Sequence, residues 1–117
     1  VAGAGGFAAL NAFGPFLSDE PSISSYIDHI EYAVSLVGPE HVALGPDFIA
    51  DIAATVDPIF TGLLVDPSNL PSVPGLVRPA DLEGLSGLLA DRLGSAAAEK
   101  VCFGTVRDFL LAALPQR

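Results

Sequence analysis

The chain has 117 residues, of which 50% are hydrophobic, and 14 acidic against five basic side chains give a net charge of −9. This length allows one domain at most, and the mean hydropathy of +0.53 excludes a disordered chain. The acidic balance argues against nucleic acid and anionic membranes as partners, and every apolar run is too short for a membrane span. We therefore expect a soluble globular chain, with the cytoplasm favoured among possible locations.

The first predicted element is a strand in the apolar run over residues 6–11. Gly14-Pro15 then predicts a loop. Asn11, at the end of the strand, would need a hydrogen-bond partner if buried. Phe13 and Phe16 flank the break, where they either line a pocket or pack into the core, and core packing is favoured.

A helix is predicted over residues 21–37, with Ser18 or Asp19 as its N-cap and Pro21 in its first turn. Apolar side chains recur along one face and polar ones occupy the others. The apolar stripe consists of Ile23, Ile27, Ile30, Val34 and Val37. Gly38-Pro39 ends the helix.

The two histidines give no metal motif. His29 and Glu31 are two residues apart, so they cannot face one ligand on a helix. His41 has no second histidine or carboxylate at ligand spacing. We interpret both histidines as structural or interface residues.

The second predicted strand is the short apolar run Val42–Leu44, which ends at Gly45-Pro46. Asp47 follows directly. In α/β folds, catalytic and ligand-binding groups lie at the carboxyl ends of parallel strands. Asp47 is therefore the first candidate for a catalytic residue, and the alternative is a loop aspartate that caps the next turn.

Residues 51–79 are expected to form a long loop with short helices, and a loop of this length is typically a lid or a binding loop. Residues 80–117 are expected to form the C-terminal helices. The first of these should bury Leu82, Leu85, Leu89 and Leu93 and stop at Gly94. Ser95 is predicted to cap a turn that ends at Gly104, and Cys102 in it should be a buried structural thiol.

A last helix is predicted to begin at Thr105, with Asp108 completing a capping box. Its apolar residues should face inward. These are Phe109, Leu110, Ala113 and Leu114. The predicted order of elements is then strand, helix, strand, loop and helices, which is an α/β arrangement with two parallel strands and a crossover helix. Such a pair leaves unpaired edges that something else must cover.

Several segments, in this order, resemble the C-terminal third of the membrane (renal) dipeptidase family. They lie at residues 5–18, 26–30, 41–49, 73–76, 79–82 and 104–110. The resemblance implies the C-terminal part of a (β/α)8 barrel, in a family that hydrolyses dipeptides with two zinc ions. The chain would form a single partial domain of that barrel.

Carried over to this sequence, the resemblance makes Asp47 the active-site aspartate after the last barrel strand. It would contact the attacking water or the nitrogen of the scissile bond. Asn11 and the loop with Phe13 and Phe16 would form part of the substrate pocket. Many members carry a second aspartate where this chain has Ile49, and the family's zinc ligands lie upstream of this sequence, so no metal ligand is expected here.

Three hypotheses follow. The chain is the C-terminal piece of a metallodipeptidase and completes a barrel with another chain or with the missing N-terminal part. Alternatively, it is a non-catalytic scaffolding or binding subunit derived from that fold. The third hypothesis is an unrelated small α/β binding module. The start at Val1, without Met or a signal peptide, favours the first.

Overall fold

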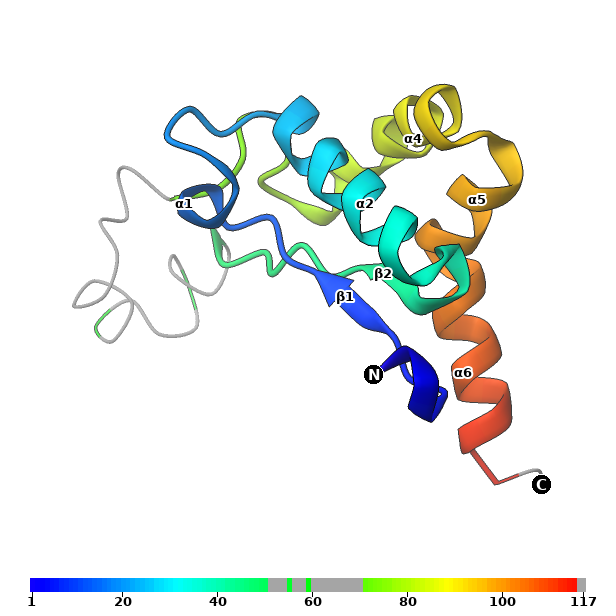
Figure 1. Ribbon diagram of the computed structural model, residues 1–117. Coiled ribbons are helices and arrows are strands. Elements are labelled where there is room, and N and C mark those ends of the chain that lie inside the picture. The colour runs from blue at the N-terminus through cyan, green and yellow to red at the C-terminus, as the bar shows by residue number, and fades with distance from the viewer. Residues whose placement is uncertain (51–54, 56–58, 60–70, 116–117) are drawn as a thin grey trace.

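The computed structural model describes residues 1–50, 55, 59 and 71–115. Two short parallel strands, β1 (Ala8–Leu10) and β2 (Val42–Leu44), pair with Ala8 opposite Val42. Helix α2 (Ile23–Val37) connects them and lies across the sheet (Figure 1). The predicted strand–helix–strand unit is therefore confirmed in these residues.

The remaining described elements surround this unit. In chain order they are the 3-10 turn Ala2–Ala4, α1 (Gly14–Leu17), the 3-10 turn Pro39–His41, the 3-10 helix Pro79–Gly84, α4 (Leu85–Leu93), α5 (Ser95–Glu99), the π-helical turn Lys100–Gly104 and α6 (Thr105–Ala113). No described helix is long and apolar enough to cross a membrane.

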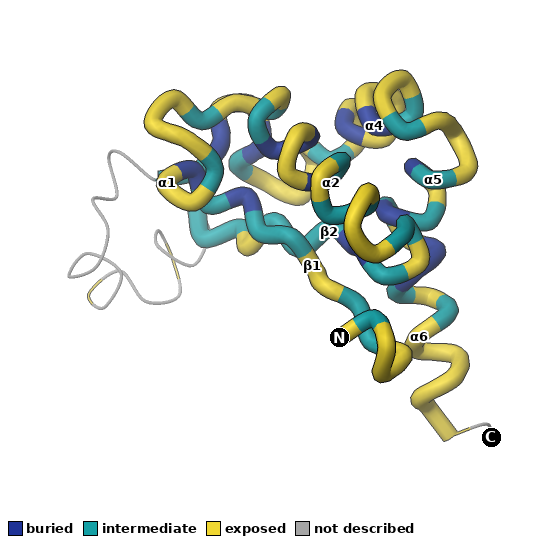
Figure 2. The backbone as a smooth tube through the Cα atoms, in the orientation of Figure 1, coloured by how far each residue is buried: buried dark blue, intermediate teal, exposed yellow. Residues whose placement is uncertain are grey.

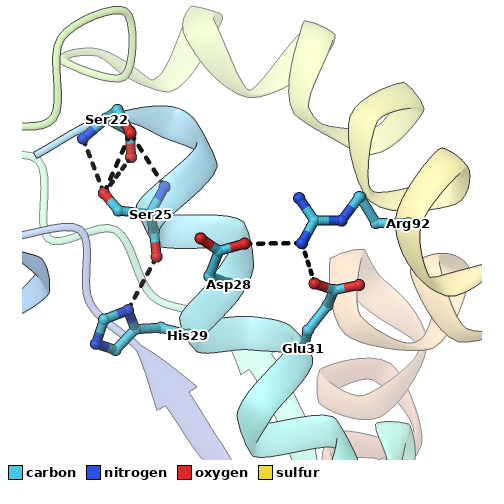
Figure 3. Close-up of polar contacts among 6 residues, drawn as sticks. All are labelled: Ser22, Ser25, Asp28, His29, Glu31 and Arg92. Carbon is cyan, nitrogen blue, oxygen red and sulfur yellow. Dashed lines mark hydrogen bonds and ion pairs between the residues drawn. The ribbon is translucent and has the colours of Figure 1, made fainter.

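The N-cap of α2 is Ser22, so the predictions of Ser18 and Asp19 were wrong. The Ser22 hydroxyl accepts the Ser25 backbone N–H at 3.1 Å, and the Ser25 hydroxyl accepts the Ser22 N–H at 2.8 Å. This reciprocal pair forms a capping box (Figure 3). Ser18 lies too far upstream, because it ends the preceding helix by donating its N–H to the carbonyl of Gly14.

The core lies between α2, β2, α4 and the π-helical turn. The buried face of α2 contains Ile27 and Ile30, as predicted, and also Tyr26, whereas Val37 at the end of the stripe is 39% exposed. These side chains pack with buried apolar residues from the other elements: Val42, Val73, Leu76, Leu85, Leu89, Ala98 and Val101. Val73 and Leu76 come from residues 51–79, which were predicted as a long loop with short helices.

The break at Gly14-Pro15 forms the short helix α1 and not the predicted loop, because Pro15 has a backbone angle suited to a first helical turn. Phe16 on this helix is 73% exposed, so the prediction that it packs into the core was wrong. Most of the predicted lid over residues 51–79 lies outside the described residues.

The C-terminal helices differ most from expectation. Leu85 and Leu89 are buried and α4 ends before Gly94, as predicted. Ser95 makes no capping bond, however, and Gly104 does not end a helix, because α5 continues through the π-helical turn into α6. The Thr105 side chain is therefore no N-cap, and its hydroxyl donates to the carbonyl oxygen of Pro39 at 2.8 Å.

The inward orientation predicted for the apolar residues of α6 was wrong. Phe109 is 42% exposed and Leu114 is 58% exposed. The helix extends away from the sheet toward the C-terminus, where the chain is exposed (Figure 2). The Phe109 ring on this helix contacts the ring of Phe7 edge-on, with the ring centroids 5.2 Å apart.

Candidate functional site

The candidate site lies at the carboxyl ends of the two strands. There the parallel ladder continues beyond the strands: the Gly45 N–H donates to the Leu10 carbonyl at 2.9 Å, and the Ala12 N–H donates to the Pro46 carbonyl at 3.2 Å. A side chain at Gly45 would not fit, since its Cβ would lie 2.8 Å from the Cβ of Ala9. The two strand ends are thus held close together.

This close approach brings Asn11 and Asp47 into contact, although they are 36 residues apart in the sequence. The Asn11 side-chain amide donates to Asp47 Oδ2 at 3.4 Å, a long hydrogen bond. The Oδ1 atom of Asn11 accepts the Phe13 backbone N–H at 2.6 Å. Because an amide oxygen must accept the second bond, the nitrogen has to face the carboxylate. Two of the predicted site residues are therefore neighbours.

Asp47 has an unusual backbone conformation. Its φ angle is 60°, in the left-handed region, and among the described residues it is the one non-glycine residue with positive φ. Aspartate and asparagine tolerate this region better than other side chains do, at a small energetic cost. Such conformations cluster at functional sites. The side chain is exposed and can reach a bound molecule.

The two predicted pocket phenylalanines lie beside each other, with ring centroids 4.8 Å apart and planes inclined by 54°. Phe13 is half-buried. Phe16 lines an open groove of about 360 Å³ together with Asn11, and its other walls come from α1, β1 and α2. Apart from these two, the lining residues are Leu10, Leu17, His29, Tyr32, Ala33 and Leu36. Asn11 thus connects the groove with Asp47.

Sequence reasoning missed Tyr26, whose hydroxyl binds the backbone carbonyl directly before Asn11. This side chain is fully buried, and its hydroxyl donates to the Leu10 carbonyl at 2.7 Å. Burial raises the pKa of Tyr26 to about 12, so the hydroxyl stays protonated near neutral pH. Its spacing four residues before Ile30 was a usable signal, because residues i and i+4 share one face of a helix.

The charged and histidine side chains elsewhere on α2 have structural partners (Figure 3). Arg92 of α4 pairs with Asp28 at 2.7 Å and also with Glu31, which ties the two helices together. His29 Nδ1 lies 2.9 Å from the Ser25 carbonyl oxygen, and His41 Nδ1 lies 2.8 Å from that of Gly6. These contacts agree with the structural interpretation of both histidines.

The described residues do not fit a zinc centre. No group of three or more His, Cys, Asp or Glu side chains lies together in this part of the chain. At the strand ends, Asp47 supplies a carboxylate and Asn11 a neutral amide, whereas catalytic zinc sites use three protein ligands, typically histidines and carboxylates.

Comparison with known protein families gave a match to part of the chain. A family model described as membrane dipeptidase (peptidase family M19) matches residues 1–71. This range includes both strands, α2 and the Asn11–Asp47 pair, and it ends before α4. Searches of curated proteins and of solved structures found no match.

Proposed function

The chain belongs to the membrane dipeptidase family, and on this premise we propose that it is the C-terminal portion of a dipeptide hydrolase with a (β/α)8 barrel. Asp47 is its catalytic carboxylate, and Asn11, Phe13 and Phe16 form part of the substrate pocket. The observation that supports this most strongly is the contact between Asn11 and Asp47 at the carboxyl ends of adjacent parallel strands.

That contact matters because strand ends are where α/β folds carry their chemistry. Asp47 is held by Asn11 through one carboxylate oxygen and remains exposed. A carboxylate in this position can accept a proton from an attacking water or hold a proton for the nitrogen of the scissile bond. Asn11 fixes the carboxylate orientation without adding a second charge.

Zinc enters the proposal only as a property of the family. Because the described residues do not fit a zinc site, we assign metal binding to another part of the barrel and derive no step through it. The chain's own contribution is the carboxylate, the amide that orients it and the aromatic wall of the pocket.

The same proposal includes a partner. The outer edge of β1 has no neighbouring strand among the described residues, and the groove beside it carries the exposed side chains of Tyr32 and Leu36. Unpaired backbone groups and apolar side chains along one edge fit a further parallel strand with its helix. The remaining strands of the barrel, from another chain or from an N-terminal part, would supply both.

Asp47→Asn in the complete metal-bearing assembly tests the proposed role. Asparagine keeps the size of the side chain and tolerates the left-handed backbone, so the substitution removes only the charge and the proton-transfer capacity. We expect kcat on a dipeptide to fall by at least about 100-fold, because a positioned acid–base group contributes about 10²–10⁴-fold. The melting temperature should hardly change.

The matched control is Asp19→Asn, which removes an exposed carboxylate between α1 and α2 and should leave kcat unchanged. Activity of Asp47→Asn within a few-fold of wild type, together with a lower melting temperature, would show that Asp47 is a structural residue that caps the next turn. If no assembly containing the wild-type chain hydrolyses any dipeptide, the non-catalytic scaffold is the correct hypothesis.

A further inference from the structure

We propose that Tyr26 is a positioning residue for the Asn11–Asp47 pair, acting through the Leu10 carbonyl from the buried side of the sheet. This inference rests on the proposed function. It assigns a role to a side chain on α2 that does not reach the substrate pocket itself.

Three segments of the chain meet at the backbone carbonyl oxygen of Leu10. The Leu10 carbonyl accepts the Tyr26 hydroxyl at 2.7 Å and the Gly45 N–H at 2.9 Å. The first bond joins α2 to β1, and the second joins β1 to the segment after β2. Leu10 directly precedes Asn11, and Gly45 stands two residues before Asp47. The atoms that hold this oxygen therefore also hold the backbone from which both functional side chains extend.

The peptide group between Leu10 and Asn11 is fixed when both lone pairs of its oxygen are engaged. Without the Tyr26 hydroxyl, only the Gly45 N–H would hold it, and the peptide plane would be free to tilt. The Asn11–Asp47 hydrogen bond is sensitive to such a tilt, since its 3.4 Å length is already near the limit for this kind of contact.

Tyr26 is well suited to act as a fixed donor. It is fully buried, so water does not compete for its hydroxyl, and its ring is held by the core. Its raised pKa keeps the proton on the oxygen throughout the neutral range. The hydroxyl therefore serves as a constant restraint and takes no part in proton transfer.

The test is Tyr26→Phe in the complete metal-bearing assembly, with kcat and KM measured on one dipeptide. A misplacement of about 1 Å can cost about 100-fold in rate. We expect kcat to fall by about 10-fold or more, with a smaller change in KM, because the carboxylate acts in the chemical step and Asn11 is only one part of the substrate pocket. Hydrogen exchange should also become faster at the Gly45 and Ala12 amides.

Ile30→Val is the matched control, because Ile30 is equally buried and lies one turn further along the same helix. It should lower the melting temperature to a comparable extent and leave kcat unchanged. Equal losses of kcat in the two variants would reduce Tyr26 to a general core residue and overturn the inference.

Asp47→Asn separates this inference from the proposed function. If Asp47→Asn abolishes activity while Tyr26→Phe keeps the wild-type kcat, the positioning role is wrong and the proposed function survives. If the wild type hydrolyses no dipeptide, or Asp47→Asn is fully active, the proposed function fails and the positioning role fails with it.

Discussion

The most direct test of the fold is Ile30→Ala in α2. Ile30 is fully buried and packs in the core formed by α2, β2, α4 and the π-helical turn. The substitution removes three side-chain carbons, worth about 2.4 kcal/mol at about 0.8 kcal/mol each. The cavity that remains adds a further term, so we expect a loss of about 3–4 kcal/mol, within the range of about 2–5 kcal/mol typical of such changes.

The control for this measurement is Asp28→Ala on the exposed side of the same helix. Asp28 is paired with Arg92, but both side chains are largely exposed, at 58% and 41%. An exposed ion pair contributes roughly 0.2–1 kcal/mol, so the control should lose less than about 1 kcal/mol.

Urea unfolding of both variants, followed by circular dichroism, supplies the comparison. The protein concentration must be the same throughout, because association raises apparent stability. Equal losses for the two variants would show that the buried face of α2 has been assigned incorrectly.

Two further predictions concern association and pH. The chain should associate through the outer edge of β1, so sedimentation at micromolar concentration should show an assembly. Tyr32→Lys should weaken this assembly, and the control Ser86→Lys on α4 should not. A well-folded monomer of the wild type would contradict the prediction. Stability should also fall as the pH rises from about 10 to about 12. The pKa of Tyr26 is raised to about 12 in the folded chain, so the Tyr26 hydroxyl ionises at lower pH in the unfolded chain, which favours unfolding over this range. Two pKa units correspond to about 2–3 kcal/mol, and Tyr26→Phe should lack this part of the alkaline loss. If the difference in urea midpoint between wild type and Tyr26→Phe stays constant over that range, the assignment is incorrect.

Features encoded by neighbouring residues were predictable from the sequence. The apolar run before Gly45-Pro46 identified β2, and the strand-end rule then selected Asp47. The stripe containing Ile27 and Ile30 identified the buried face of α2. Each of these inferences depends on the order of residues within one or two turns, which the sequence states directly.

Features that depend on contacts between distant segments were not predictable. Nothing near Tyr26 indicates that its hydroxyl meets the Leu10 carbonyl, 16 residues away. The exposure of Phe16 likewise depends on what lies beside β1, and its neighbours in the sequence carry no such information. The left-handed backbone of Asp47 was not predicted either, although aspartate is one of the few side chains that tolerate this conformation.

The π-helical turn Lys100–Gly104 has a consequence for how this chain can vary in length. Such a turn is an α-helix that contains one surplus residue. Deleting one residue there would restore regular winding and leave the later side chains on nearly the same face of the helix, because the wide turn already absorbs the surplus residue. Thr105 would then still reach the Pro39 carbonyl from α6. A single-residue deletion in this turn therefore preserves the connection between the C-terminal helix and the strand–helix–strand unit, whereas the same deletion in the regular winding of α5 would rotate Thr105 away from Pro39 by about 100°.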